Sequence, residues 1–300
     1  MDTSLLSLLI QAARDEHAAI IQYLRHAYLM GEGELAGEIE AIAREEMRHF
    51  WMISRWILRL GGQPTPERGF TDLAGNRPDE WMQRDVAAED RAIALYEQLL
   101  TMVQDPDLRS DIAYILEDER THRGEFVHYH TKVQAMAAEV APGAGETPPP
   151  AASPADLEAL QWGIAHEYSA LLQYLMHTFL TEEHTEIGWQ LKMQAINEMQ
   201  HMGWLSEELA SLGHDIPLTP HPVQVPSTPQ AMLEANLALE NETAAAYAGH
   251  GQRGVSPGIR DLLGRIEKQE TYHAALFKRL LKTLGPRSKS WTVGSLKGKE

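Results

Sequence analysis

The sequence contains no cysteine, little positive charge and no long hydrophobic run. Without cysteine, the chain can form no disulfide, no thiolate metal site and no cysteine-ligated iron–sulfur centre. Its 26 Lys and Arg against 43 Asp and Glu give a formal net charge of -17, whereas binding to phosphate needs clustered basic residues. No stretch approaches the roughly 20 apolar residues that span a bilayer. We therefore expect no nucleic-acid partner and no membrane association.

The N-terminal stretch MDTSLLSLLIQAARDE has no basic leader and only a short apolar run. It is typical of an amphipathic helix and not of a secretory signal. Hydrophobic residues make up 43% of the 300 positions, which suits about two globular domains with a core each. We expect a soluble, cytoplasmic protein.

The two halves of the sequence repeat each other across a proline-rich segment. EHAAIIQYLRHAYLM from Glu16 resembles EYSALLQYLMHTFL from Glu167, at an offset of 151 residues. EEMRHF from Glu45 recurs as NEMQHM from Asn197, at an offset of 152. Between them, AEVAPGAGETPPPAASP favours an extended linker over a helix. We predict a first domain over 1–138, a linker over 139–154, a second domain over 155–284 and a flexible tail over 285–300.

Each half divides into four long segments with helical periodicity, which in the first half cover about 3–30, 34–60, 79–104 and 107–137. Residues that end or begin helices recur at equivalent places. They are Gly61 and Gly213, Pro78 and Pro229, and Pro106 and Pro257. Asp105 and Ser256 precede the last two prolines and are expected N-caps. Long helices with one longer connection predict an all-α chain of two tandem four-helix bundles.

Five glutamates are followed three residues later by a histidine, an arrangement that places both side chains on one side of a helix. Four of these pairs are related by the repeat, and the unrelated pair, Glu125/His128, is taken as coincidental. The four are Glu46/His49, Glu119/His122, Glu198/His201 and Glu270/His273, on the second and fourth segments of each half. The first and third segments add Glu16, Glu89, Glu167 and Glu240. Helical bundles build carboxylate-bridged two-metal sites from this combination.

The charge of these residues favours bound metal. Four ionised glutamates inside a bundle would be strongly destabilising unless they were paired, protonated or bound to metal. Two divalent ions would balance them and leave two neutral imidazoles as nitrogen ligands. Oxygen-rich ligands favour iron or manganese over zinc, and we expect iron, with manganese as the second choice. The expected bridging ligands are Glu46, Glu119, Glu198 and Glu270, the expected terminal ligands are Glu16, Glu89, Glu167 and Glu240, and the histidines complete the set.

These motifs resemble the bacterioferritin and rubrerythrin branch of the ferritin-like superfamily. EHAAIIQYLRHA is similar to the first-helix signature of bacterioferritin, EEMRHF to its second-helix ligand motif and ILEDERTH to its fourth-helix ligand motif. The resemblance covers both halves, apart from the linker and the tail. It implies a ferroxidase centre in each half, at which dioxygen oxidises ferrous ions. The twelve ligands would then also be the catalytic residues.

Several residues near the predicted ligands need separate interpretation. Tyr23, Tyr96, Tyr174 and Tyr247 each lie seven residues after a terminal glutamate, on the same helical face. The resemblance implies that Tyr23 and Tyr174 lie near the metals, where they would hydrogen-bond a ligand or supply an electron. Packing in the core is the alternative.

Two methionines and two pairs of histidines have weaker signals. Met47 and Met199 occupy the place of the haem-ligating methionine of bacterioferritin, but methionine commonly fills gaps in cores, and haem is not expected. His26 and His177 match each other without a carboxylate at coordinating spacing, and we expect a structural role. His17 and His166 do not correspond under the repeat and receive no role.

The chain ends in GPRSKSWTVGSLKGKE, a basic segment with no equivalent in the first half. The spacing of Trp291, Val293 and Leu296 suits an extended peptide lying in a groove, although a frayed terminus is the alternative. WTVGSLKG resembles the C-terminal targeting peptide with which cargo proteins dock inside encapsulin shells. The resemblance implies an encapsulin shell protein as partner and an encapsulin nanocompartment in the cytoplasm as the location.

The sequence therefore predicts an encapsulin-cargo ferroxidase that oxidises Fe(II) with dioxygen at two di-iron centres per chain, for iron storage or detoxification. The same ligands also serve di-iron or di-manganese oxidases, oxygenases, peroxidases and catalases, because reactivity depends on surroundings that spacing does not reveal. A non-enzymatic iron-binding adaptor is the third interpretation. The formation of a homo-oligomer is left open.

Overall fold

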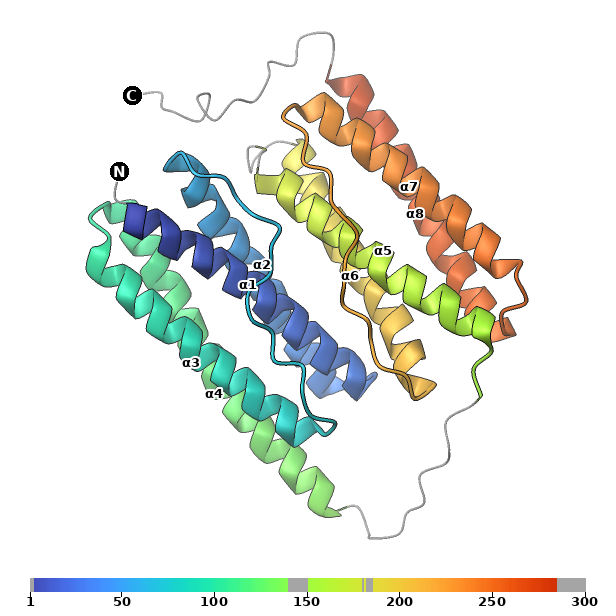
Figure 1. Ribbon diagram of the computed structural model, residues 1–300, viewed down its shortest axis with the longest axis horizontal. Coiled ribbons are helices and arrows are strands. Elements are labelled where there is room, and N and C mark those ends of the chain that lie inside the picture. Colours follow the sequence, from blue (N-terminus) through green and yellow to red (C-terminus); the bar gives the residue numbers. More distant parts are fainter. Residues whose placement is uncertain (1–2, 140–150, 180, 182–185, 285–300) are drawn as a thin grey trace. The chain divides into compact units, whose positions relative to one another are not determined.

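The computed structural model describes residues 3–139, 151–179, 181 and 186–284, which form eight helices and no strand. The first half contains α1 (Thr3–Met30), α2 (Glu34–Arg59), α3 (Pro78–Met102) and α4 (Pro106–Glu139). The second half contains α5 (Pro154–Phe179), α6 (Glu186–Ser211), α7 (Pro229–Gly251) and α8 (Pro257–Thr283). The predicted fold class, all-α with two tandem four-helix bundles, is confirmed (Figure 1).

The chain forms two compact units, Met1–Pro148 and Pro149–Glu300. In the first unit α1 packs on α2 and α3, and α4 packs on α3 and α2, so that the four helices form a closed ring. The second unit repeats this ring with α5 to α8. Residues 140–150 of the predicted linker and the whole predicted tail lie outside the described residues.

The helix boundaries follow the proline and glycine positions of the sequence. All four prolines named above are the first residues of their helices. Gly61 and Gly213 have φ angles of 80° and 78°, a conformation that glycine adopts without strain. Asp105 is the expected N-cap, since its Oδ1 accepts hydrogen bonds from the backbone of Asp107 and Leu108 at 2.9 and 3.0 Å.

Ser256 is the N-cap residue of α8, as predicted, but its side chain makes no capping hydrogen bond. Its backbone N–H instead donates to Oδ1 of Asp156 over 2.7 Å. Asp156 therefore links the beginning of α5 to the beginning of α8.

A long crossing joins the second and third helices of each bundle and is held by a glutamine. In the first unit Nε2 of Gln22 donates to Asp85 on α3 over 2.8 Å, and its Oε1 accepts from the backbone of Asp72 over 2.8 Å. The second unit repeats this arrangement with Gln173, Asn236 and Gln224. Gly69 approaches α1 so closely that a Cβ would lie 2.9 Å from the carbonyl oxygen of Arg14. These contacts fix each crossing along the first helix of its bundle.

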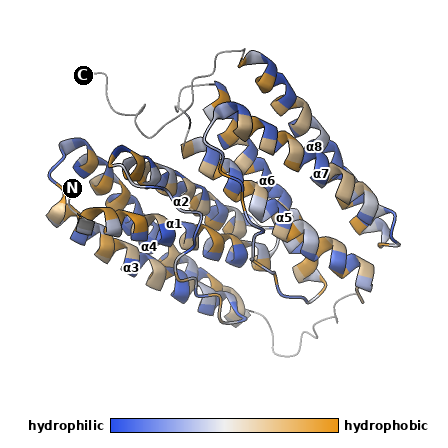
Figure 2. Cartoon of the chain, turned by 45° about the horizontal axis from the view of Figure 1, so that its top comes forward, coloured by the Kyte–Doolittle hydropathy of each residue, from blue (hydrophilic) through white to orange (hydrophobic). Residues whose placement is uncertain are grey.

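Each helix carries both hydrophobic and hydrophilic residues (Figure 2). The interior includes fully buried aromatic side chains, among them Tyr23, Tyr96, Tyr174 and Tyr247. Within the described residues, no helix is both long enough and apolar enough to cross a membrane. The interior also contains the charged residues that the sequence singled out.

Candidate metal centres

All twelve predicted ligands lie inside the bundles, and none is more than 4% exposed. In each half the four helices bring six of them together, with one potential ligand atom from each residue of a group within 4.8 Å of the others. The two groups of the first half share Glu46 and Glu119, and those of the second half share Glu198 and Glu270. A carboxylate common to two neighbouring groups stands where a bridging ligand must stand.

The two histidines of the first cluster direct Nδ1 toward the carboxylates. Nδ1 of His49 lies 2.9 Å from Oε2 of Glu46 and 3.1 Å from Oε1 of Glu119. Nδ1 of His122 lies 2.8 Å from Oε1 of Glu46 and 3.6 Å from Oε2 of Glu119. The two rings stack with centroids 5.8 Å apart. The cluster therefore has two sides, each with one imidazole.

The second cluster reproduces this geometry. Nδ1 of His201 lies 3.0 Å from Oε2 of Glu198 and 2.7 Å from Oε1 of Glu270. Nδ1 of His273 lies 3.1 Å from Oε1 of Glu198 and 3.5 Å from Oε2 of Glu270. Its rings are 5.7 Å apart. Glu167 on α5 and Glu240 on α7 complete this cluster.

Unsatisfied atoms inside the clusters fit a pair of cations. Within the described residues, eight buried ligand atoms have no hydrogen-bond partner, because their near neighbours lie in poor directions for a hydrogen bond. They are Oε1 of Glu46, Oε2 of Glu89, Oε1 of Glu119, Nδ1 of His122, Oε2 of Glu167, Oε1 of Glu198, Oε1 of Glu270 and Nδ1 of His273. Buried polar atoms are rarely left unpaired. Oxygen atoms with a minority of imidazole nitrogens suit iron or manganese.

The pKa values of the first cluster favour protonated glutamates and histidines when no cation is bound. Burial and the charges of Glu119 and Glu46 hold the pKa values of Glu16 and Glu89 well above the usual range. Although burial lowers it, the surrounding carboxylates raise the pKa of His49 well above its usual range and that of His122 to about 11. Protons therefore balance the buried negative charge.

The second cluster shows the same pattern. Burial and Glu270 raise the pKa of Glu167 to about 8, and burial and Glu198 hold the pKa of Glu240 well above its usual range. Burial lowers the pKa of His273, but Glu198 and its neighbours raise it to about 12. Such a buried cluster of acids and bases fits a metal site, because cations would displace its protons.

Four tyrosines hydrogen-bond the predicted terminal glutamates. The hydroxyl of Tyr96 on α3 donates to Oε1 of Glu16 on α1, and that of Tyr247 on α7 donates to Oε1 of Glu167 on α5. Tyr23 and Tyr174 make the converse bonds, to Glu89 and Glu240. Both interpretations of Tyr23 and Tyr174 are seen, because each hydroxyl hydrogen-bonds a predicted ligand and each ring packs in the core, on Phe126 and Phe277. The seven-residue spacing indicated the shared face but not the bond to the opposite helix.

The outer nitrogens of the histidines contact residues that the sequence analysis did not single out. Nε2 of His49 lies 3.1 Å from Oδ2 of Asp118, and Nε2 of His122 lies 3.0 Å from Oε2 of Glu45. In the second half, Nε2 of His201 lies 2.5 Å from Oε1 of Gln269, and Nε2 of His273 lies 3.4 Å from Nδ2 of Asn197. Each partner directly precedes a predicted bridging glutamate, and this position was the signal that could have found it.

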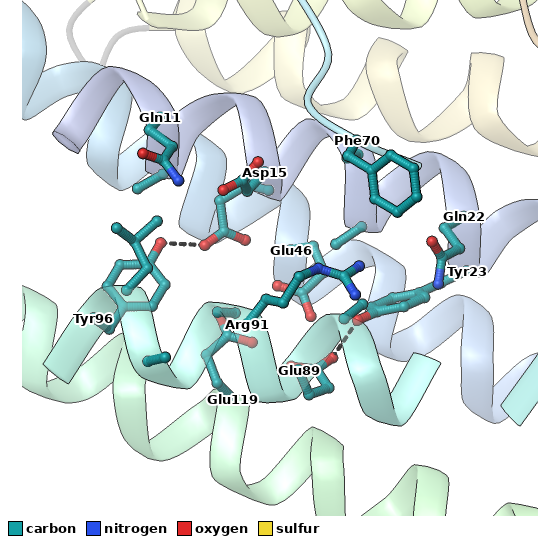
Figure 3. Close-up of a pocket in the computed structure, with 18 residues that line it drawn as sticks. Gln11, Asp15, Gln22, Tyr23, Glu46, Phe70, Glu89, Arg91, Tyr96 and Glu119 are labelled. Carbon is teal, nitrogen blue, oxygen red and sulfur yellow. Dashed lines mark hydrogen bonds between the residues drawn. The ribbon is translucent and has the colours of Figure 1, made fainter. Parts of the chain in front are cut away.

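A pocket of about 390 Å³ reaches the first cluster between α1 and α3 (Figure 3). Its deep wall includes Glu16, Glu46, Glu89 and Glu119, and alanines form much of the rest. The guanidinium of Arg91 lies over the exposed ring of Phe70, 5.5 Å from its centre, and Figure 3 shows the side chain extending across the pocket toward Gln22. The pocket therefore lies against four of the predicted ligands of the first half.

Larger side chains occupy equivalent positions in the second half. Trp162 stands where the first half has Gln11, and it packs 4.7 Å from the ring of His166 and 5.2 Å from that of Tyr247. His166 is hydrogen-bonded to the hydroxyl of Thr243 over 2.7 Å. Trp162, His166 and Tyr247 therefore occupy the positions that Gln11, Asp15 and Tyr96 take in the pocket wall of the first half.

The remaining candidates lie outside the two clusters. Met47 and Met199 are buried, at 6% and 1% exposure. His26 contacts both oxygens of Asp85 at 2.9 Å, and His177 contacts the carbonyl oxygen of Gln224 at 2.7 Å, which fits the expected structural role. His17 stacks on Phe50, with ring centroids 5.7 Å apart. Neither Glu125 nor His128 belongs to a metal-binding group within the described ranges.

Comparison with known proteins identifies the relatives of both halves. Residues 6–136 match one family described as "Ferritin-like domain", and residues 156–283 match a second family with the same description. A bacterioferritin from Desulfovibrio desulfuricans is 30% identical over 126 residues, which are 39% of this chain and 69% of that protein. Protein CotJC of Bacillus subtilis is 27% identical over 142 residues, which are 38% of this chain and 75% of that protein.

Solved structures of two bacterioferritins are also similar to part of the chain. The Desulfovibrio desulfuricans structure, described as showing the diiron site in different catalytic states, has a TM-score of 0.42 and 24% identity and covers 48% of this chain and 95% of that one. The Mycobacterium tuberculosis structure has a TM-score of 0.43 and 19% identity and covers 46% of this chain and 92% of that one.

Proposed function

Because the chain belongs to the ferritin-like family, with one such domain in each half, we propose that it is an encapsulin-cargo ferroxidase with two centres. Its reaction is the oxidation of Fe(II) by dioxygen, for iron storage or detoxification. The observation that carries the proposal is the convergence of four buried glutamates and two histidine Nδ1 atoms in each half, with ligand atoms left unpaired.

Ferrous ions are the substrate in this proposal, and two of them supply the pair of electrons that dioxygen accepts. Glu46, Glu119, Glu198 and Glu270 take the shared positions, because each belongs to both groups of its half. The other four glutamates and the four histidines take terminal positions. Since the clusters are almost fully enclosed, bulk water does not screen their charges, and the attraction between carboxylates and ions is strong.

The tyrosines orient the terminal carboxylates. Each phenol O–H donates to one oxygen of a terminal glutamate, which leaves the other oxygen directed toward the cluster. Burial and the nearby glutamates hold the pKa of Tyr23 well above its usual range, so the phenol keeps the proton that it donates. Orientation of ligands by surrounding hydrogen bonds is a general property of metal sites.

Docking inside an encapsulin shell is the second part of the proposal. It is supported by the resemblance of WTVGSLKG to cargo-targeting peptides and by the spacing of Trp291, Val293 and Leu296, which lie outside the described residues. In a cytoplasmic nanocompartment of this kind, ferric product would accumulate as mineral inside the shell.

Removing one shared glutamate from each half tests the ferroxidase. The full chain should bind close to four ferrous ions and consume dioxygen rapidly. Glu46→Ala and Glu198→Ala should each lower the stoichiometry by about two ions and remove about half of the fast oxidation, and the double variant should remove nearly all of it. Glu125→Ala, at a half-buried residue of α4 outside both clusters, serves as the matched control. Iron that binds in full but is not oxidised would contradict the enzyme and leave the non-enzymatic adaptor.

Deleting residues 291–300 tests docking separately. When the chain is co-expressed with an encapsulin shell protein, the full-length protein should co-purify with shells, and the truncated protein should not. The truncated protein should keep its ferroxidase rate, because its centres are untouched. Retention of the truncated chain in shells would contradict this role of the tail.

The pocket of the first half favours one alternative, an oxidase, oxygenase, peroxidase or catalase with iron or manganese that acts on an organic substrate or on peroxide. At about 390 Å³, the pocket lies within the range of small-molecule sites. Under this alternative, the loaded protein would turn over peroxide or an organic reductant without added Fe(II). Parallel assays with ferrous iron, peroxide and a phenolic reductant distinguish the two functions.

A further inference from the structure

The two centres differ in the groups that contact the outer nitrogens of their histidines. In the first half these groups are carboxylates: Asp118 on α4 contacts His49 on α2, and Glu45 on α2 contacts His122 on α4. In the second half the equivalent residues are the amides Gln269 and Asn197. The distances are comparable, between 2.5 and 3.4 Å. The main difference is therefore charge and not geometry.

The amide of Asn197 places its nitrogen next to Nε2 of His273 at 3.4 Å. An imidazole that uses Nδ1 as a ligand carries its proton on Nε2, which then needs an acceptor. Gln269 offers such an oxygen to His201, whereas the amide nitrogen of Asn197 faces His273 and also donates to Oε1 of Gln194 over 3.3 Å. Two of the four histidines therefore contact anions, and two contact neutral amides.

Nearby charged residues reduce the charge difference between the two centres, but the first centre remains the more negative one. Arg48 donates to the same oxygen of Asp118 that faces His49, over 2.8 Å, and it reduces the negative charge available there. Gln200 replaces it in the second half. Two carboxylates and one guanidinium leave one net negative charge around the first centre, whereas Gln269, Asn197 and Gln200 leave none. The side chain of Glu45 is 51% exposed, so solvent weakens its effect, and Asp118, at 22%, is the stronger of the two.

A second difference acts in the same direction. Tyr114, which lies under the guanidinium of Arg48, has Arg265 as its counterpart in the second half. The guanidinium of Arg265 lies 4.9 Å from the centre of the Trp204 ring, and that ring lies 5.6 Å from the ring of His201. In the second half a cation therefore lies on the ring next to His201, and no carboxylate contacts the outer nitrogen of that histidine to offset it.

A carboxylate that accepts the outer N–H of a ligating histidine makes the imidazole a stronger donor, and loss of such a partner typically lowers metal affinity about 10- to 100-fold. An anionic surrounding also favours the more highly charged ferric ion over the ferrous ion. From these differences, and on the basis of the proposed function, we propose that the two centres are unequal. The first binds iron more tightly and at a lower reduction potential, and Asp118 and Glu45 are positioning residues that cause the difference.

Single-centre variants of the full chain make the comparison direct. Glu198→Ala leaves the first centre and Glu46→Ala leaves the second. Fe(II) affinity is measured without oxygen by competition with a coloured chelator, and the reduction potential is measured by spectroelectrochemistry. The first centre should bind Fe(II) about 10- to 100-fold more tightly and have the lower potential. Equal affinities and potentials would overturn the proposal, whereas failure of both variants to bind iron would overturn the proposed function as well.

Reciprocal exchanges assign the effect to the outer partners. Asp118→Asn in the first centre should weaken binding about tenfold and raise the potential, and Gln269→Glu in the second should do the opposite. Asp118→Glu, which keeps the charge, should restore most of the loss. If neither exchange changed the Fe(II) affinity or the reduction potential, the proposal would be overturned.

Arg48→Gln separates electrostatic tuning from a purely structural role. Removing the guanidinium frees Asp118 to interact with His49 alone, so the first centre should bind Fe(II) more tightly and at a still lower potential. A purely structural role predicts loosening from this change, as it does from Asp118→Asn. The helix content and the thermal unfolding of each variant report whether its first bundle is folded. If Arg48→Gln and Asp118→Asn both weakened Fe(II) binding, the proposal would be overturned.

Discussion

The hydroxyl of Tyr23 donates a hydrogen bond over 2.5 Å to Oε1 of Glu89, so a side chain of α1 holds the terminal glutamate of α3. Conversely, the hydroxyl of Tyr96 on α3 donates a hydrogen bond to Glu16 on α1. Both partners are buried, and a lost bond cannot be replaced by bulk water. Each terminal carboxylate is therefore positioned by the helix opposite its own.

Tyr23→Phe should destabilise the first bundle by about 1–3 kcal/mol, because it leaves a buried carboxylate oxygen without its donor. Chemical unfolding of the metal-free protein measures this cost. Tyr272→Phe is the control, since that side chain is 65% exposed and its change should stay within about 0.5 kcal/mol. Equal stability of Tyr23→Phe and the unaltered protein would contradict the orienting role of the phenol.

Gln11→Trp should slow iron oxidation at the first centre several-fold. The change gives the wall of the 390 Å³ pocket a tryptophan, the residue type that the second half has at the equivalent position, Trp162. Stopped-flow measurements in the Glu198→Ala background report the first centre alone. Equilibrium affinity for Fe(II) should change little, since no ligand is altered. An unchanged rate would show that ions and dioxygen reach the centre by another path.

Metal binding should release protons, up to about four per centre near neutral pH. In the metal-free first cluster, burial and neighbouring glutamates raise the pKa values of Glu16 and Glu89, and carboxylates raise those of His49 and His122 against the effect of burial. These groups hold protons that a cation must displace, so affinity should fall as pH falls. Calorimetry in buffers of different ionisation enthalpy counts the protons, and a pH-independent affinity would contradict the assignment.

Asp85→Ala should destabilise the first bundle by about 3–5 kcal/mol, because Asp85 is fully buried against His26 and its removal leaves partners unpaired. Asp85→Asn should cost much less, since Asn236 occupies the equivalent place in the second bundle and accepts from Gln173. Urea unfolding of both variants gives the comparison. If Asp85→Asn lowered the free energy of unfolding as much as Asp85→Ala does, the charge of Asp85, and not its hydrogen-bonding capacity, would stabilise the bundle.

The sequence predicted the helices and the convergence of the twelve candidates because both follow from local rules. Proline at a first turn and glycine after a last turn fixed the boundaries, as at Pro78 and Gly61. Helical spacing combined with the repeat then placed Glu46 and His49 on the inner face of α2. Their role as metal ligands stays a prediction.

Contacts between helices could not be predicted in the same way. Asp118 lies four residues before His122 on its own helix, yet it contacts His49 on α2. The choice depends on the relative shift of two packed helices, which periodicity does not encode. The contact of Asp156 with the backbone N–H of Ser256 is of the same kind, because it joins the beginnings of α5 and α8, which are far apart in the sequence.

The exchange of contacts between α2 and α4 has a consequence for assembly. His49 depends on Asp118 of the other helix and His122 depends on Glu45, so both imidazoles are aligned by one shared register. A slip of a single residue along the axis, about 1.5 Å, would misplace both at once. A wrongly assembled bundle would then hold no centre with one imidazole aligned and the other not, so a half-formed site that passes a single electron to dioxygen would not arise.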